Sequence, residues 1–480
     1  MKYEAVIGLE VHVQVRTASK MFCSCANEFG AEPNTNVCPV CMGYPGVLPV
    51  PNQAAIMATV KAGLLTGCTI AKFSKFDRKN YFYPDMPKNY QISQFDLPFC
   101  SNGSMKLSGT GFSGAPLPEK TVGITRIHLE EDVAKLTHFR QESGVDYNRA
   151  GVPLMEIVGE PDLRSADEAY AYLTNLKEIM RFGEISDCDM EKGQMRCDVN
   201  ISLRPVGTEK FGTKIELKNL NSFRAVHRAI DFEIERQAEL LDQGVVLKQE
   251  TRGWNDDRGE SYLMRTKESA HDYRYFPEPD LMPVTFTDAD IEAIRATLPE
   301  LPEAKRQRFC ADYGLTAYDA EVLTADKVLA AYFDTAAKLV KNPKNLANWI
   351  ISGLLALTGE AGVSVADCPV TPEKLAGLVN AIDSGKINGK IAKDVLPEMF
   401  ATGKDADTVI SEKGLAQVSD TSAIAGAVTE VLQNNAKQLA EYKAGNAKIL
   451  QFFVGQVMKL TKGKANPGLV VAELKKQLDA

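Results

Sequence analysis

The sequence predicts an α+β fold, in which a large antiparallel, β-rich domain precedes helical domains. Residues 6–15, VIGLEVHVQV, alternate almost without exception between apolar and polar side chains. This period of two indicates a β-strand that turns one face toward a core. Near residue 290 the composition changes from Gly, Pro and aromatic residues to Ala, Leu, Lys and Glu. The apolar residues beyond it repeat with a period of about 3.6, which indicates amphipathic helices.

The length of the chain predicts more than one domain. A chain of 480 residues is too long for a single ordinary core. We place a β-rich domain at residues 1–292, with a small insertion at 21–45, and a helical domain at 293–405. The segment 401–414, ATGKDADTVISEKG, has the composition of a break. Residues 406–480 are therefore predicted to form a separate tail domain.

The composition favours a soluble globular protein, with 44% hydrophobic and 25% charged residues. The net charge of −8 does not attract polyanions to the whole surface, so contact with a nucleic acid requires a local basic patch. No run approaches the ~18 apolar residues that are needed to span a bilayer. The first residues, MKYEAVIGLEVHV, lack the features of a signal peptide. We therefore expect a cytoplasmic protein that makes no membrane contact.

Four of the ten cysteines, Cys23, Cys25, Cys38 and Cys41, fall within one short segment, CSCANEFGAEPNTNVCPVC. In a reducing cytosol, clustered cysteines favour metal binding over disulfides. The pairs C-x-C and C-x-x-C, joined by a loop, can place four thiolates tetrahedrally around Zn²⁺. Four sulfur ligands leave no open coordination position, so such a site is structural. The alternative is four unrelated buried thiols.

Two segments that resemble phosphate-binding loops lack the required structural context. Residues 109–114, GTGFSG, match G-x-G-x-x-G, but two prolines and a predicted strand follow where a dinucleotide fingerprint requires a helix. Residues 207–214, GTEKFGTK, are close to a P-loop, but Thr213 stands at the lysine position and a predicted strand follows. Both segments are predicted to be turns.

Other predicted strands repeat this alternation and place ionisable side chains on a polar face. Carboxylates from several strands can hold Mg²⁺ through oxygen, and interleaved Arg and Lys can bind phosphate. Such a sheet could bind a magnesium nucleotide without a P-loop. The alternative is an ordinary solvated face of an antiparallel sheet. The side chains concerned are Glu10, His12, Arg126, His128, Glu130, Glu156, Arg196, Asp198, Asn200, Ser202, Arg204, Lys214, Glu216 and Lys218.

Several long motifs carry a resemblance to a known family. They are VIGLEVHVQV, KFDRKNYFYPDMPKNYQISQFD, GITRIHLEEDVAKLTH, GVPLMEIVGEPD, RCDVNISLRP, ELKNLNSF, DYRYFPEPD and KILQFFVGQVMKLTKGKANP. Across essentially its whole length, the chain resembles the GatB family of the bacterial tRNA-dependent amidotransferases.

The resemblance implies a fold and an activity. The first domain is then a cradle similar to the catalytic fold of glutamine synthetase. It uses ATP to phosphorylate the side-chain carboxylate of Glu on tRNA(Gln) or of Asp on tRNA(Asn), and ammonia then displaces the phosphate. This makes the chain an ATP-dependent carbon–nitrogen ligase. The helical and tail domains bind the tRNA.

The resemblance also implies partner subunits. A partner amidase (A) subunit hydrolyses glutamine and supplies the ammonia through a tunnel, and a small C subunit joins the two. The sequence agrees with this division, because no nucleophile elbow or amidase-like serine/lysine cluster is recognisable in it.

The family's functional residues can be matched onto this sequence. The metal site that holds Mg²⁺ beside the ATP phosphates corresponds to Glu10, His12, Glu130 and Glu156, and Asp198 is a further candidate catalytic carboxylate. Charge and placement alone, rather than the family match, make Arg78, Lys79, Arg196, Lys214 and Lys218 candidate nucleotide contacts, with Glu216 beside them. Asn80, Tyr83 and Tyr90 could face either the nucleotide or the aminoacyl end. Some family members lack the four cysteines, so the zinc is expected to stabilise the protein rather than to catalyse.

The segment AKILQFFVGQVMKLTKGKANPGLVVAELKKQL has an apolar helix face with four lysines beyond it, Lys448, Lys459, Lys462 and Lys464. By itself such a group is typical of a solvated face. The resemblance favours contact with tRNA.

Two other classes of function stay open on the sequence. In the first, the chain is a tRNA-binding scaffold and the chemistry lies on a partner. In the second, it is a self-contained carboxylate–amine ligase that uses free ammonia on a small substrate. The sequence also leaves open whether Glu-tRNA, Asp-tRNA or both are substrates.

Overall fold

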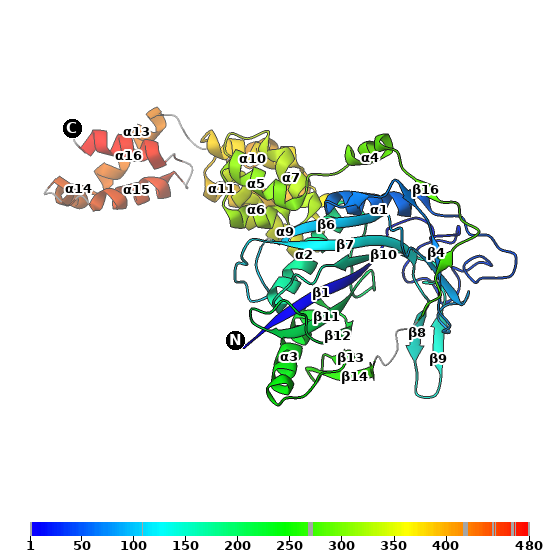
Figure 1. Cartoon of the computed structure of the whole chain (residues 1–480). Helices are drawn as coiled ribbons and strands as arrows, with labels where there is room; N and C mark the ends of the chain where they lie inside the picture. Colours follow the sequence, from blue (N-terminus) through cyan, green and yellow to red (C-terminus); the bar gives the residue numbers. More distant parts are fainter. Residues whose placement is uncertain are drawn as a thin grey trace. The chain divides into compact units, whose positions relative to one another are not determined.

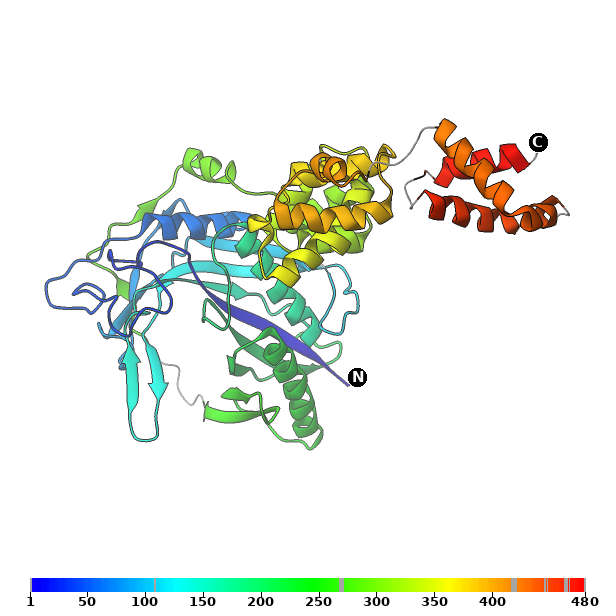
Figure 2. The same cartoon turned by 180° about the vertical axis from the view of Figure 1, so that it is seen from behind.

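The computed structural model describes residues 2–107, 109–266, 272–415, 421–443, 446, 448–461, 465 and 467–478. The chain forms two compact units, Met1–Pro302 and Glu303–Ala480. The first contains the strands and the second is helical (Figure 1, and from behind in Figure 2).

A mixed sheet forms the centre of the first unit. Among the described residues it has nine strands in the order β14-β13-β12-β11-β1-β10-β7-β6-β2. All neighbours are antiparallel except β12 and β13. The strands are β1 (Tyr3–Gln14), β2 (Thr69–Ile70), β6 (Cys100–Leu107), β7 (Lys120–Glu131), β10 (Pro153–Gly159), β11 (Met195–Pro205), β12 (Ile215–Leu220), β13 (Glu250–Asn255) and β14 (Glu260–Thr266).

Helices pack on the apolar face of this sheet. They are α1 (Gln53–Leu65), α2 (Ala166–Phe182) and α3 (Phe223–Asp242), and α4 (Asp288–Arg295) packs against α1. Ser165 and Ser222 cap α2 and α3 by accepting a backbone N–H of the first turn. Residues Ile7, Leu9 and Val11 of β1 are buried in the resulting core. Because side chains alternate along a strand, the even-numbered residues of β1 face the opposite side.

Three smaller sheets extend the first unit. One joins β15 (Phe276–Pro277), β4 (Asp77–Asn80) and β5 (Tyr90–Ser93). The second pairs β3 (Phe73–Ser74) with β16 (Val284–Thr285), and the third is a hairpin of β8 (Lys135–His138) and β9 (Ser143–Asp146). The strand β5 packs against β7, so the first of these sheets borders the polar face of the central sheet.

The second unit consists of helices around two hydrophobic cores. One core spans residues 309–410 and the other residues 424–478. The helices are α5 (Pro302–Tyr313), α6 (Ala317–Thr324), α7 (Lys327–Ala337), α8 (Pro343–Trp349), the π-helix η1 (Ile350–Leu354), α9 (Leu355–Ala361), the 3₁₀-helix η2 (Val365–Asp367), α10 (Pro372–Asp383), α11 (Gly389–Thr402), α12 (Ala406–Glu412), α13 (Thr421–Asn434), α14 (Ala436–Lys443), α15 (Ile449–Leu460) and α16 (Pro467–Leu478). Within the described ranges, none of the helices is both long and apolar enough to cross a membrane.

The structure confirms the predicted fold class, a largely antiparallel sheet followed by helices. It also confirms that neither loop motif opens a helix, because residues 109–114 lie between β6 and β7 and residues 207–214 between β11 and β12. The domain boundaries at residues 292 and 405 stay predictions, as does the likeness of the cradle to glutamine synthetase.

Candidate active site

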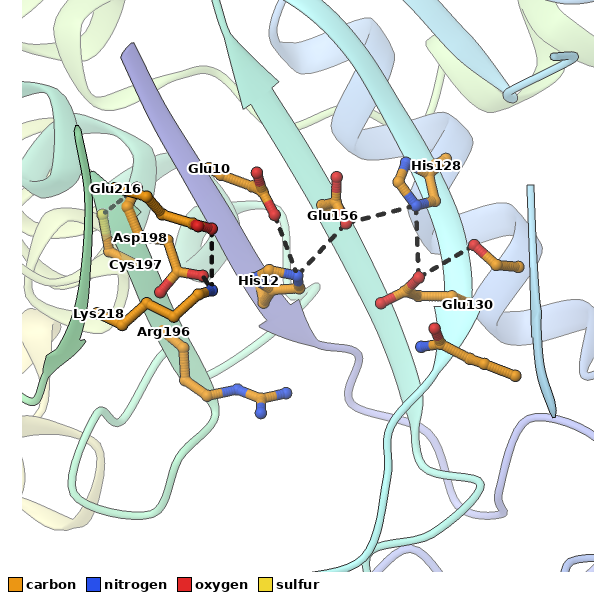
Figure 3. A network of polar contacts seen from close by, with 12 residues as sticks. Glu10, His12, His128, Glu130, Glu156, Arg196, Cys197, Asp198, Glu216 and Lys218 are labelled. Atoms are coloured by element: carbon orange, nitrogen blue, oxygen red, sulfur yellow. Dashed lines mark hydrogen bonds and ion pairs between the residues drawn. The ribbon is translucent and has the colours of Figure 1, made fainter. Parts of the chain in front are cut away.

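The pairing of three antiparallel strands gathers ionisable side chains on the polar face of the sheet. Across β1 and β10, His12 lies opposite Glu156, and across β10 and β7, Glu156 lies opposite His128. Glu10 and Glu130 stand two residues away on the same faces of β1 and β7. We call these five residues the carboxylate–histidine cluster (Figure 3).

Glu156 lies at the centre of the cluster. Its Oε2 is 3.4 Å from His12 Nε2 and 3.7 Å from His128 Nε2. His12 Nε2 is also 3.9 Å from Glu10 Oε1, and His128 Nε2 is 3.4 Å from Glu130 Oε2. Two trios can each hold a metal ion, Glu10–His12–Glu156 and His128–Glu130–Glu156, since the ligand atoms of each lie within 4.8 Å of one another.

The cluster has the electrostatic character of a cation site. Burial raises the pKa of Glu10, and the neighbouring charge of Glu156 raises it further. Burial also raises the pKa of Glu156, but the neighbouring His128, His12 and Lys79 outweigh burial and hold this pKa well below its usual value. The cluster therefore buries carboxylates close together, and burial and the charge of Glu156 both disfavour the ionised form of Glu10. A bound cation would offset the repulsion between these carboxylates.

The cluster offers two kinds of metal ligand. The oxygens of Glu10, Glu130 and Glu156 are the kind that Mg²⁺ or Mn²⁺ prefers, whereas the imidazole nitrogens of His12 and His128 are more typical ligands of transition metals. The buried Nδ1 of His128 has no hydrogen-bond partner in the part of the chain that the structure describes. The structure thus divides the four predicted metal ligands between two trios that share Glu156, and it adds His128 to the trio of Glu130. The period-two alternation in IHLEE already placed His128 on the face of Glu130.

Basic side chains border the cluster. Arg126 Nη2 is 3.8 Å from Glu156 Oε1. Burial lowers the pKa of Lys79, but Glu130, Tyr275 and Glu156 raise it above its ordinary value, so the ammonium is charged beside these carboxylates. The sequence pattern places Arg126 on the polar face but assigns it no particular role.

A second acidic group lies on the neighbouring strands. Asp198 of β11 is opposite Glu10, and it accepts a hydrogen bond from Lys218 Nζ, which also lies 3.2 Å from Glu216 Oε1. Thr251 Oγ1 donates to Glu216 Oε2 at 2.8 Å. These contacts orient Asp198 and Glu216 beside the cluster (Figure 3).

Arg196 is held by an aspartate that the sequence did not single out. Asp132 follows β7 and is fully buried, and its Oδ2 accepts from Arg196 Nη2 at 2.9 Å and from Gln14 Nε2 at 2.8 Å. Burial raises the pKa of Asp132, but Arg196 and Arg149 outweigh it and lower that pKa below its usual value. Asp132 therefore fixes Arg196 on the strand position opposite His12.

Other predicted nucleotide contacts lie elsewhere. Arg78 binds Glu278 through Nε and Nη2 at 2.7 and 2.8 Å, and it stacks on Tyr90. Lys214 is exposed just before β12, and among the described residues no contact joins it to the cluster. Asn80 Nδ2 donates to the carbonyl of Tyr273, whereas Tyr83 is exposed. The phosphate and nucleotide roles of these residues stay predictions.

The four clustered cysteines converge in the loop after β1. Their Sγ atoms lie within 4.8 Å of one another, and all four are free thiols. A hydrogen bond with Cys23 lowers the pKa of Cys41 to about 4, and burial raises the pKa of Cys25 to about 11. The Nζ of buried Lys20 lies 3.8 Å from Cys41 Sγ. Four converging sulfurs fit a tetrahedral Zn²⁺ site.

The predicted lysine group of the tail is described only in part. Lys448 precedes α15 and Lys459 lies in its last turn. Lys462 and Lys464 lie outside the described residues.

Fold and site together define an α+β protein with a candidate metal and phosphate site on the polar face of its sheet. The family model described as the GatB/GatE catalytic domain matches residues 5–292, and the one described as the GatB domain matches residues 331–478. The chain belongs to the GatB family, which confirms the resemblance seen in its motifs.

Curated relatives match the chain from end to end. The chain is 53% identical over 479 residues to a protein of Thermoanaerobacter pseudethanolicus, with 100% of both chains covered. It is 55% identical over 473 residues to one of Persephonella marina, covering 98% of each. It is 51% identical over 482 residues to one of Carboxydothermus hydrogenoformans, covering 99% of each. All three relatives are named as the second (B) component of an aspartyl/glutamyl-tRNA(Asn/Gln) amidotransferase.

Proposed function

We propose that this chain carries out the tRNA-dependent transamidation for which its relatives are named. It uses ATP to phosphorylate the side-chain carboxylate of Glu on tRNA(Gln) or of Asp on tRNA(Asn), and the resulting acyl phosphate reacts with ammonia. The observation that carries the proposal is the carboxylate–histidine cluster with Lys79 and Arg126 beside it, in a chain similar over its full length to those relatives.

The chemistry explains the need for charge at this site. An oxygen of the substrate carboxylate attacks the γ-phosphorus of ATP, the bond to ADP breaks, and ADP leaves. The substrate carboxylate is already ionised at neutral pH, so no general base is required. Two anions must nevertheless meet, and the positive charges of Lys79 and Arg126 reduce their repulsion. Ammonia then attacks the acyl carbon, phosphate leaves, and the surplus proton passes to water.

The cluster would hold Mg²⁺ through Glu10, His12, Glu130 and Glu156, with His128 as a further ligand. When bound, the ion supplies the charge that neutralises the phosphate oxygens. His12 is a ligand or an orienting group, since its Nε2 already faces Glu156 and Glu10. Asp198 and Glu216 hold Lys218 toward the same face. The four cysteines would hold a structural Zn²⁺ that shapes the loop after β1.

The assignment implies partners and a location. We infer that a partner amidase subunit supplies the ammonia, that a small third subunit completes the assembly, and that the complex works in the cytoplasm. This rests on the relatives being named as one subunit of an amidotransferase. The helical second unit is proposed to bind the tRNA.

ATP turnover by the reconstituted complex tests the proposal. Phosphate release should require misacylated tRNA and should be accompanied by amide formation on the tRNA. A scaffold subunit would leave all turnover with the partner, so substitutions in the cluster would have no effect. A ligase for a small substrate would turn over ATP without tRNA. Either result would refute the proposed function.

A further inference from the structure

A group of aromatic side chains stands beside the carboxylate–histidine cluster. Phe95 and Tyr275 stack face to face, with ring centroids 4.3 Å apart and an interplanar angle of 11°. Tyr273 meets Tyr275 edge to face at 6.1 Å. Phe95 is 58% exposed, which leaves the outer side of the stack open to a ligand. We call Phe95, Tyr273 and Tyr275 the aromatic platform.

The platform is built from segments far apart in the sequence. Asn80, at the end of β4, binds the carbonyl of Tyr273 through its backbone N–H and its side chain, both at 3.0 Å. The strand β15 follows Tyr275 directly and pairs with β4. These contacts fix the segment of Tyr273 and Tyr275, and Tyr275 stacks on Phe95, which lies two residues beyond the end of β5. The platform is therefore a positioned surface rather than a single exposed ring.

The platform adjoins the proposed phosphorylation site. Ser93 Oγ donates to Glu130 Oε2 at 3.0 Å, and Phe95 follows Ser93 by two residues, a span of at most about 7 Å. Lys79 Nζ lies 5.2 Å from the ring centroid of Tyr273 and forms no ion pair with any described residue. Burial raises the pKa of Tyr275, and the charges of Glu130 and Glu156 raise it further against the effect of Lys79.

The proposed substrate explains why aromatic rings stand at this place. The reacting carboxylate belongs to an amino acid that is esterified to the last ribose of the tRNA. The unpaired 3′ end of the tRNA must therefore lie next to the site at which this carboxylate is phosphorylated. Aromatic side chains bind unpaired bases by stacking, and a nearby lysine favours the phosphate backbone. We propose that the aromatic platform stacks the 3′-terminal base of the tRNA and so positions the aminoacyl group; this rests on the proposed function.

Binding of two uncharged tRNAs to the complete subunit complex tests the platform. One is full-length tRNA(Gln), and the other is the same tRNA without its 3′-terminal nucleotide. The wild-type complex should bind the full-length tRNA more tightly. Phe95→Ala should weaken binding of the full-length tRNA about tenfold and leave the truncated tRNA unchanged. Phe95→Trp should preserve the difference between the two tRNAs.

Phe211→Ala is the matched control. Phe211 is 56% exposed and lies beside a basic side chain, Arg204, as Tyr273 lies beside Lys79, but it belongs to the loop between β11 and β12. This variant should bind both tRNAs as the wild type does. A general loss of folding would weaken binding of both tRNAs, whereas loss of the platform removes only the preference for the 3′ nucleotide.

Other outcomes would overturn the inference. If Phe95→Ala binds both tRNAs like the wild type but has a raised Kd for ATP, the platform holds the adenine of ATP instead. If Phe95→Ala fails to assemble with the other subunits, the surface is a protein interface. A wild-type complex that binds neither tRNA would refute the proposed function itself, which separates that failure from a failure of the platform.

Discussion

Glu156→Gln should reduce tRNA-dependent ATP turnover more than substitution of any other carboxylate in the cluster. Glu156 belongs to both candidate metal trios, whereas Glu10 and Glu130 each belong to one. Its side chain is only 10% exposed, so solvent screens its charge weakly. Glutamine keeps the size of the side chain and removes the charge. The substitution therefore deprives both trios of their shared anionic oxygen.

The structure sets the expected magnitude. Loss of one electrostatic contact to a transition state typically costs about 3–4 kcal/mol, or roughly a few hundredfold in rate. Glu10→Gln should show a loss of this size, with partial rescue by raised Mg²⁺ or Mn²⁺. Glu156→Gln removes a contact from both trios. Its loss should therefore exceed that of Glu10→Gln by a further factor of about 10 or more.

Phosphate release by the reconstituted complex with misacylated tRNA is the assay, with glutamine hydrolysis and tRNA affinity measured beside it. Glu4→Gln is the control, because Glu4 lies on the same face of β1, is exposed to 30% against 31% for Glu10, and pairs with Arg204. It should retain nearly full turnover. The reasoning is refuted if Glu156→Gln keeps turnover within tenfold of the wild type, or if Glu4→Gln loses as much.

Three further predictions address other parts of the chain. Metal analysis should find about one equivalent of zinc, and Cys38→Ser should lower it and destabilise the first unit; zinc-free protein with paired disulfides would contradict this. Asp132 has a lowered pKa, so its contribution to stability is present above its unfolded value of 3.8 and is lost as the pH falls below it. Asp132→Asn should therefore cost about 1–3 kcal/mol in urea unfolding at neutral pH, because the buried carboxylate loses its charge-assisted hydrogen bond from Arg196, whose side chain is 37% exposed and stays solvated. The free energy of unfolding should fall less steeply with decreasing pH in this variant than in the wild type. An unchanged slope of unfolding free energy against pH would contradict the assignment. Truncation after Leu415 spares the buried residues of α12. It should weaken tRNA binding and make that binding less dependent on salt, while tRNA-independent glutamine hydrolysis stays unchanged. Unaltered tRNA affinity would mean that the tail has another role.

The local parts of the site follow from the sequence. The period of two in β1 places Glu10 and His12 on one face whatever the strand pairs with, and the same holds for His128 and Glu130 in β7. The spacing of the four cysteines is also enough to predict that they converge, because one loop brings their Sγ atoms together. These features depend on short stretches of chain, where geometry is set by neighbours in sequence.

The parts that the sequence could not supply depend on strand order and register. Glu156 meets both His12 and His128 only because β10 lies between β1 and β7. The charge of Arg78 alone suggests a phosphate contact, but the side chain finds Glu278 through the pairing of β4 with β15. Asp132 stands just beyond the end of β7, so the alternation gives no signal for its role. Such pairings between distant segments are tertiary, and no local pattern encodes them.

Transfer of ¹⁸O from substrate to phosphate is the most direct test of the central claim, that the complex phosphorylates the carboxylate carried by the tRNA. Glutamate labelled with ¹⁸O in both side-chain carboxylate oxygens is attached to tRNA(Gln) and turned over with ATP and glutamine. If a carboxylate oxygen attacks the γ-phosphorus and ammonia later breaks the carbon–oxygen bond, each phosphate released carries one ¹⁸O atom. Wild-type complex should give this labelled phosphate, and Glu156→Gln should release almost none. Unlabelled phosphate formed in step with the amide would contradict the account, because water would then be the group that attacks ATP.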